Sequence, residues 1–262
     1  MMLATQVHRA LGIQSVALTD VGRRRANNED SFVADDDLAF YLVGDGVGGC
    51  ASGEVASAEA VAIVHSLVQR RRAVIDAFVE QPSRKTQNQV RELVERSVQS
   101  ASRIVFGMGQ LDPTKRGMAS TLSSLLCAGR TGFIAQVGDS RVYLARGQRC
   151  QQLTHDHTLA NERGAYGLAV AEELGQASAK HVITRCVGYH ESVSVDMLTV
   201  PIEPGDRFLI CSDGLHGYLG DGELEHLVSG RRADVAERLL ELANRRGGRD
   251  NITLIVCDVT AA

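Results

Sequence analysis

Three apolar runs that each end in an aspartate constrain the fold of this chain more than any other feature. LAFYLVGD ends at Asp45, GFIAQVGD ends at Asp139 and RFLICSD ends at Asp213. Short, nearly continuous apolar runs bounded by turn residues indicate buried strands. Carboxylates that follow such core strands are expected to converge on one rim of the fold.

Three further acidic residues lie in turns beside strands: Glu29 and Asp30 in RANNEDSF, and Asp250 in GRDNITLIV. Each aspartate has a simpler explanation, because Asp and Asn favour turns by bonding their own backbone. Together, however, clustered carboxylates repel one another unless they share protons or cations. Magnesium and manganese prefer carboxylate and water oxygens. The set therefore predicts a metal site built from oxygen ligands.

The rest of the chain predicts an α+β fold in one domain over residues 1–262. Apolar residues at three- and four-residue spacing indicate long helices, and short β-rich runs between Gly turns indicate an antiparallel meander. Runs of strands followed by helices favour antiparallel sheets with helices on their outer faces, a four-layer αββα sandwich. The expected helices are 53–72, 86–106, a short one at 168–174, 221–228 and 234–245. The expected strands are 119–128, 133–137, 141–145, 149–153, 193–200, 207–211 and 251–259.

Composition excludes several classes of protein. With 262 residues and 44% hydrophobic content, the chain can bury a large core and is not disordered. The longest stretch without Asp, Glu, Lys or Arg is Gly117 to Gly129, shorter than the roughly 20 residues of a membrane helix. No secretory signal is evident near the N-terminus, so a cytoplasmic location is expected. The scattered cysteines Cys127, Cys211 and Cys257 lie in apolar runs and are expected to be core thiols.

The order of the acidic motifs, RANNED, DGVGG, GDSR, SDG and RDN, resembles the signature series of the metal-dependent protein phosphatases, the protein phosphatase 2C family. The resemblance runs from Val16 to Val259. RANNEDS, DGVGGxxxGE and GDRFLICSDGL look like the bacterial branch. The resemblance implies two Mn²⁺ or Mg²⁺ ions and a third, weaker one.

The resemblance also implies roles for individual residues. Asp45 is expected to bridge two ions, with the backbone carbonyl of Gly46 as a further ligand. Asp213 and Asp250 are expected to complete the shell of one ion, and Asp139 to help bind the third ion.

Four residues from two motifs complete the implied site. Glu29 is expected to reach an ion through water, and Asp30 and Asn251 to support the ligands. Arg25 matches the arginine that holds the substrate phosphate in this family. A guanidinium can bind two phosphate oxygens at once. Arg25, Asp45 and Asp213 are thus the expected catalytic residues.

The implied reaction is hydrolysis of phosphoserine or phosphothreonine in proteins by direct attack of a metal-bridging hydroxide. The implied partners are phosphorylated proteins and a cognate bacterial Ser/Thr kinase, without nucleic acid or membrane, and the chain is expected to be a monomer. Two alternatives stay open: a catalytically silent module that binds phosphoproteins, and a carboxylate-metal nuclease or phosphodiesterase. The 4% aromatic content and the lack of a basic stripe count against nucleic acid.

Several residues carry weaker expectations. Val47 stands where many eukaryotic relatives have a histidine that is the candidate general acid, so the group that protonates the leaving group is unassigned. His155, His157, His181 and His216 are interpreted as ordinary loop histidines rather than ligands. Residues 155–181 correspond to the flap of the family.

Two further features of the same loops have competing explanations. Arg23 and Arg24 are interpreted as part of a solvated charged loop. The glycines around Asp45 favour a metal loop over a phosphate-binding loop, because the lysine of a Walker motif is missing. They are Gly44, Gly46, Gly48, Gly49 and Gly53.

Overall fold

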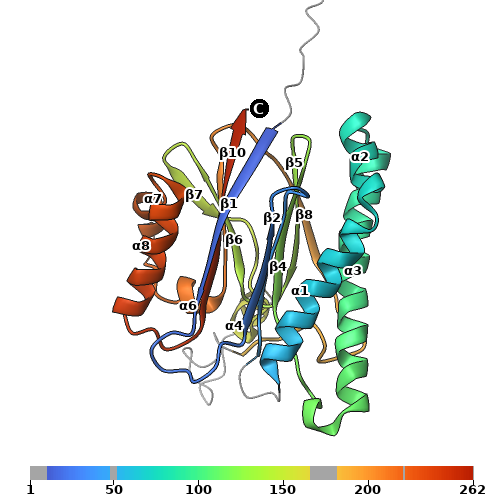
Figure 1. The fold of residues 1–262 in the computed structure, drawn as a ribbon, viewed down its shortest axis with the longest axis vertical. Helices are drawn as coiled ribbons and strands as arrows, with labels where there is room; N and C mark the ends of the chain where they lie inside the picture. The colour runs from blue at the N-terminus through green and yellow to red at the C-terminus, as the bar shows by residue number, and fades with distance from the viewer. Residues whose placement is uncertain (1–10, 48–51, 166–181, 221, 262) are drawn as a thin grey trace, which may run out of the picture.

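The computed structural model describes residues 11–47, 52–165, 182–220 and 222–261. Two five-stranded antiparallel sheets pack face to face at the centre, and helices cover both outer faces (Figure 1). The expected α+β class and its αββα layering are confirmed.

One sheet, which we call sheet A, lies beside the C-terminal helices. The N-terminal strand of this sheet pairs antiparallel with the C-terminal strand over ten residues, from Leu11 opposite Ala261 to Asp20 opposite Ile252. In spatial order the strands are β1 (Leu11–Asp20), β10 (Ile252–Ala261), β9 (Arg207–Cys211), β6 (Arg141–Arg146) and β7 (Arg149–Gln152).

The other sheet, sheet B, lies beside the N-terminal helices. In spatial order its strands are β2 (Asp30–Asp35), β3 (Phe40–Asp45), β4 (Leu122–Ala128), β5 (Thr131–Val137) and β8 (Asp196–Pro201). Alternate residues of β3 face different layers. Phe40 and Leu42 pack toward α1 (Gly53–Gln69) and α3 (Arg84–Leu111), whereas Tyr41 and Val43 pack between the sheets. Burial on both faces explains why the run is almost entirely apolar.

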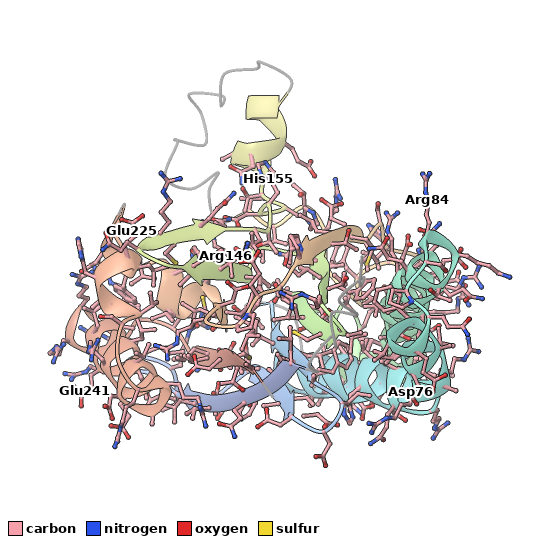
Figure 2. The ribbon with its side chains drawn as sticks, turned by 90° about the horizontal axis from the view of Figure 1, so that it is seen from above. Asp76, Arg84, Arg146, His155, Glu225 and Glu241 are labelled. Atoms are coloured by element: carbon pink, nitrogen blue, oxygen red, sulfur yellow. The ribbon has the colours of Figure 1, made fainter. Side chains whose placement is uncertain are left out.

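The helical layers differ in part from the expectation. Residues 53–72 hold α1 and the start of a separate helix, α2 (Arg72–Glu80), which the sequence did not predict. The helix α3 is longer than the expected 86–106 and begins with a capping box between Ser83 and Thr86. Figure 2 shows charged residues of the two layers, such as Asp76 and Glu241, on opposite sides of the sandwich.

The opposite helical layer follows β9. It contains the short α6 (Asp213–His216), which was not expected, then α7 (Glu223–Leu227) and α8 (Arg232–Arg245). The side chains of Val235 and Leu239 on α8 pack against Leu254 and Val256 of β10. Both of the predicted C-terminal helices are therefore present: α7 is shorter than the expected 221–228, and α8 begins two residues before the expected 234–245 and ends where expected.

The expected meander over residues 119–153 is wrong in one respect. β4 pairs with β5 and β6 pairs with β7, but β5 belongs to sheet B and β6 to sheet A. The turn between β5 and β6 therefore crosses from one sheet to the other. Because that turn carries Asp139, the crossing places this residue between the sheets.

The segment between β7 and β8 lies outside both sheets where it is described. It contains α4 (Leu159–Ala165), whereas the expected helix at 168–174 lies outside the described residues. None of the described helices combines the length and apolar character needed to span a bilayer. The core thiols are confirmed: Cys127, Cys211 and Cys257 are buried and free, and burial raises the pKa of Cys127 to about 12.

Candidate metal centre

Asp45 ends β3, and Thr121 fixes its position. The Asp45 amide donates to Thr121 Oγ1 at 3.0 Å, and the Thr121 amide donates to the Asp45 carbonyl at 2.8 Å. On the neighbouring strand, Asp30 stands directly opposite Asp45. Directly opposed residues of an antiparallel pair point to the same face, so β2 and β3 present two carboxylates side by side.

Asp30 joins this pair to sheet A. The Ser212 hydroxyl donates to Asp30 Oδ2 at 2.8 Å, and Ser212 directly precedes Asp213 at the start of α6. The Ser212 amide in turn donates to the Thr253 carbonyl of β10 at 3.0 Å. Asp213 is thereby delivered from sheet A to the rim where sheet B ends in Asp45.

Asp139 lies in the crossing turn between β5 and β6 and is only 5% exposed. The hydroxyls of Thr121 and Ser140 are 2.7 Å apart and join the turn to β4. His216 Nε2 donates to the Asp139 carbonyl at 2.9 Å. The same end of the sandwich therefore holds aspartates from both sheets and from the turn between them.

Asn251 organises the loop that carries Glu29. Its Oδ1 accepts from the Glu29 amide at 2.8 Å, while its Nδ2 donates to the carbonyls of Val21 and Asn27 at 3.0 and 2.9 Å. The Glu29 carboxylate lies over the start of α1, since a Cβ added to Gly53 would come within 3.1 Å of its Oε2. Asn251 therefore supports this loop rather than pointing at an ion.

We expect Asn251→Ala to lower the free energy of unfolding by about 2 kcal/mol, because an amide and two carbonyls would lose a partner that is 4% exposed. Urea unfolding of the metal-free protein measures this loss. Asn88→Ala, on an exposed face of α3, is the control and should stay within about 0.5 kcal/mol of the wild type. Equal stability of Asn251→Ala and the wild type would contradict the assigned role.

Burial and mutual repulsion raise the pKa values of the central carboxyls. The pKa of Asp45 is raised well above its ordinary value, first by burial and then by the charges of Asp30, Asp213, Asp139 and Asp250. Burial likewise raises the pKa of Asp30 and of Asp139 to about 7 each. These groups are close enough to disfavour one another's charge, which a cation would relieve.

The residues at this rim fit divalent cations for two reasons: their donors are oxygens, and some of these oxygens are buried without a hydrogen bond. Within the described part of the chain, Asp30 Oδ1 and Asp139 Oδ1 are buried and accept no hydrogen bond. No three His, Cys, Asp or Glu side chains among the described residues are gathered closely enough to hold an ion by themselves. The implied ligand set also uses a backbone carbonyl and water, which are hard oxygen donors of the same kind.

Arg25 lies at this rim but binds a carboxylate in the structure. Its NH2 donates to Asp250 Oδ2 at 2.7 Å, with the two side chains 40% and 36% exposed. The hydrogen bond to Asp250, opposed by burial, raises the pKa of Arg25. The expected phosphate ligand is thus charged, accessible and next to an expected metal ligand.

The contacts of the described histidines agree with the interpretation that they are not metal ligands. His157 Nδ1 accepts from the Gly138 amide at 3.1 Å, so its Nε2 carries the proton toward Asp196 Oδ2 at 3.1 Å. Burial lowers the pKa of His157, which disfavours the charged form of the ring. His155 is exposed near α4 (Figure 2), and His181 lies outside the described residues.

The family model of protein phosphatase 2C matches residues 22–253. The chain belongs to the protein phosphatase 2C family. The match covers most of the chain and includes every motif from RANNED to RDN.

Other members of the family are similar over nearly the whole phosphatase. The protein phosphatase PhpP of Streptococcus pneumoniae is 34% identical over 242 residues, 90% of this chain and 94% of that protein. The crystal structure of the Mycobacterium tuberculosis serine/threonine phosphatase PstP/Ppp matches with a TM-score of 0.79 and 30% identity, covering 95% of this chain and 99% of that one.

A second PstP structure is described as a catalytic domain in complex with two manganese ions. It is 32% identical to this phosphatase, with a TM-score of 0.78, and the match covers 95% of this chain and 99% of the PstP chain. The names of these relatives agree with the predicted activity.

Sequence reasoning did not identify three polar residues that position the aspartates of this phosphatase. They are Thr121, Ser140 and Ser212. Two of them could have been found by position, because Ser140 directly follows Asp139 and Ser212 directly precedes Asp213. Thr121 has no such signal.

Proposed function

We propose that this chain, as a single catalytic domain over residues 1–262, hydrolyses phosphoserine and phosphothreonine in proteins. The observation that carries the proposal is the convergence of Asp30 and Asp45 from sheet B with Asp213 after sheet A, beside the accessible Arg25. A phosphate dianion needs positive charge around its oxygens, and cations held by these carboxylates would supply it beside Arg25.

We assign the ligands as the motifs predict. Asp45 and the Gly46 carbonyl, with Asp213 and Asp250, hold two Mn²⁺ or Mg²⁺ ions, and Asp139 helps hold a weaker third. When bound, such ions lower the pKa of water and neutralise charge that develops on the phosphate. The buried unsatisfied oxygen of Asp139 supports its assignment.

Two residues of the proposed centre, Asp30 and Asn251, hold the ligands in place. Asp30 ties the two sheets together through Ser212, and Asn251 fixes the backbone of Glu29, which would contact an ion through water. Because these contacts are already made within the protein, Asp30 and the backbone of Glu29 are in position before a cation binds. Asp250, in contrast, would have to exchange Arg25 for the cation.

Arg25 binds and orients the phosphate of the substrate. Its guanidinium reaches Asp250 at 2.7 Å, so a phosphate at the proposed metal centre lies within the reach of the same side chain. A phosphate dianion in place of the Asp250 carboxylate could accept two charge-assisted hydrogen bonds from the guanidinium. A lysine carries the same charge but cannot make that paired contact.

The proposed partners are phosphorylated proteins and the Ser/Thr kinase that produces them. We place the activity in the cytoplasm of a bacterium and expect a monomer that acts without nucleic acid or membrane. The formal charge of −4 supports the absence of nucleic acid among the partners, since it does not favour binding to polyanions.

Turnover of a phosphothreonine peptide tests the proposal. We expect hydrolysis with Mn²⁺ or Mg²⁺, measured as released phosphate, and its loss with EDTA.

Arg25→Lys should lower kcat/KM by about tenfold, because the bidentate contact is lost while the charge stays.

Arg103→Lys on α3 is the matched control for Arg25→Lys and should leave kcat/KM unchanged, since Arg103 is exposed on a different layer. A folded wild type that binds manganese without hydrolysing the peptide would contradict the proposal. That outcome would favour the silent phosphoprotein-binding module.

A further inference from the structure

Two loops lie against each other beside Arg25: residues 21–28 and residues 246–250. The Arg23 amide donates to the Gly248 carbonyl at 2.6 Å. Gly22 has a φ of +77°, and a Cβ there would lie 2.2 Å from the Asp250 carbonyl. The loops are therefore in tight backbone contact, and side chains that project from them start from fixed positions.

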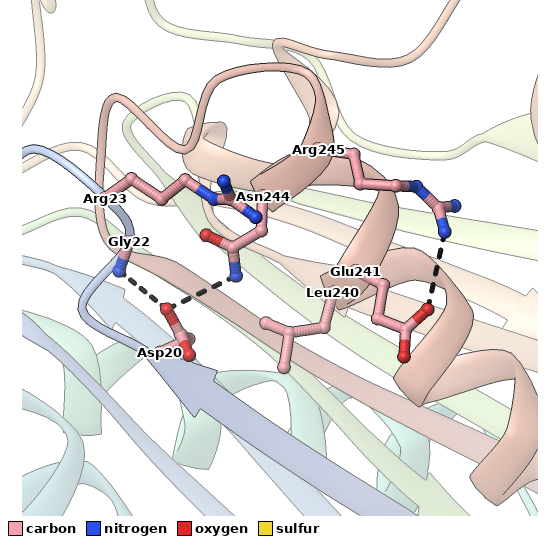
Figure 3. A pocket seen from close by; sticks show the side chains of 7 residues that line it. All are labelled: Asp20, Gly22, Arg23, Leu240, Glu241, Asn244 and Arg245. Atoms are coloured by element: carbon pink, nitrogen blue, oxygen red, sulfur yellow. Dashed lines mark hydrogen bonds and ion pairs between the residues drawn. The ribbon is translucent and has the colours of Figure 1, made fainter.

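A groove of about 610 Å³ lies between the first of these loops and the last turns of α8 (Figure 3). Figure 3 shows the Arg23 side chain extending along the groove toward the Asn244 amide, with Leu240 on one wall. The lining residues are Asp20, Gly22, Arg23, Leu240, Glu241, Asn244 and Arg245.

The acidic residues of the groove already have partners. Asp20 Oδ1 accepts from the Gly22 amide at 2.7 Å and from Asn244 Nδ2 at 3.3 Å. Glu241 pairs with Arg245 at 3.5 Å (Figure 3). In the structure, these two carboxylates are thus bound to groups other than Arg23.

Three guanidinium groups on the paired loops have no partner among the described residues: Arg23, Arg24 and Arg249, all exposed. Their neighbours Arg25 and Arg246, in contrast, pair with Asp250 and Glu223. The unpartnered charges thus adjoin the proposed phosphate-binding arginine. We call these three residues, together with the groove, the arginine groove.

We infer that the arginine groove binds Asp and Glu side chains of the substrate that flank the phosphorylated residue. This rests on the function proposed above and adds the substrate class, an acidic phosphopeptide. Guanidinium groups bind carboxylates through paired hydrogen bonds. Arg23 is two residues from Arg25, a separation of at most about 7 Å along the chain. A peptide whose phosphate contacts Arg25 therefore brings residues two to four positions away within reach.

The fixed loops favour this assignment over a nonspecific charge effect. The backbone contact between the loops fixes the positions from which the three side chains project, which restricts the spacing of their guanidinium groups. Each exposed pair contributes weakly, so two or three pairs together are expected to change kcat/KM by about fivefold to tenfold. Such pairs weaken as ionic strength rises.

The test compares two phosphothreonine peptides that differ only in their flanking residues, Glu in one and Gln in the other. With Mn²⁺, the wild type should prefer the Glu peptide by about fivefold to tenfold in kcat/KM. The double variant Arg23→Gln/Arg249→Gln should lose this preference. Its turnover of p-nitrophenyl phosphate, which has no flanking residues, should equal that of the wild type.

The double variant Arg103→Gln/Arg91→Gln removes the same charge from exposed positions on α3 and should keep the preference. A wild type that hydrolyses p-nitrophenyl phosphate but treats both peptides alike would overturn this inference and leave the phosphatase function intact. Equal loss of the preference in the α3 variant would assign it to net charge and also overturn the inference. No turnover of either small or peptide substrate would refute the phosphatase function itself.

Discussion

Asp45→Asn should lower Mn²⁺-dependent kcat/KM on a phosphothreonine peptide by about 1,000-fold or more. Burial raises the pKa of Asp45, and the charges of Asp30, Asp213, Asp139 and Asp250 raise it further, so Asp45 is close to the other carboxylates of the site. An amide in its place removes the anionic oxygen expected to hold both ions, and charge stabilisation by such ions is worth several kcal/mol. The readout is released phosphate at saturating manganese.

A thermal unfolding series separates this loss from misfolding. Mn²⁺ should raise the Tm of the wild type, because a ligand that binds only the folded state stabilises it, and should raise the Tm of Asp45→Asn much less. Asp37→Asn, in the exposed turn between β2 and β3, is the matched control and should behave as the wild type does. Full turnover by Asp45→Asn would refute the proposed centre.

Gly214→Ala is expected to lower the free energy of unfolding by at least about 3 kcal/mol and to remove activity. A Cβ at Gly214 would stand 1.8 Å from the Asn251 carbonyl, so α6 and the loop before β10 would have to separate. Overpacking against backbone cannot be relieved by a rotamer change. Since those two segments carry Asp213 and Asp250, the shift would also move proposed ligands apart. Urea unfolding and peptide turnover measure the two effects.

Gly107→Ala is the control for the glycine substitution. Gly107 lies within α3, and a Cβ there would meet nothing within 4 Å. Alanine is a better helix former than glycine, so this variant should be more stable by about 0.5 to 1 kcal/mol. Wild-type stability of Gly214→Ala would mean that α6 and the Asn251 loop are not in close contact.

The motif aspartates could be predicted because each is fixed by its immediate neighbours. Asp45 and Asp213 follow apolar runs that are buried on both faces, so their place at a strand end is a local property. The two-layer arrangement of helices followed from runs of strands and helices in the same way. Both conclusions depend on short-range patterns in the sequence.

Features that depend on distant partners could not be predicted. Asn251 bonds the carbonyls of Val21 and Asn27, which lie 230 and 224 residues away in the chain, and no local pattern records these contacts. The division of the expected meander had the same cause. β5 and β6 are separated by a tight turn like that of any hairpin, and only their pairing with β8 and β9 assigns them to different sheets.

The pairing of β1 with β10 has a consequence for synthesis of the protein. β10 is bonded on one edge to β1 and on the other to β9, so β1 has no strand partner until residues 252–261 have left the ribosome. Contacts between residues so far apart in sequence form slowly, because a long loop must close first. The nascent chain should therefore complete sheet B well before sheet A, and it should acquire its ion-binding rim only once β10 has emerged and paired with β1 and β9. A chaperone that shields exposed strands would act on β1 and β9 during this interval.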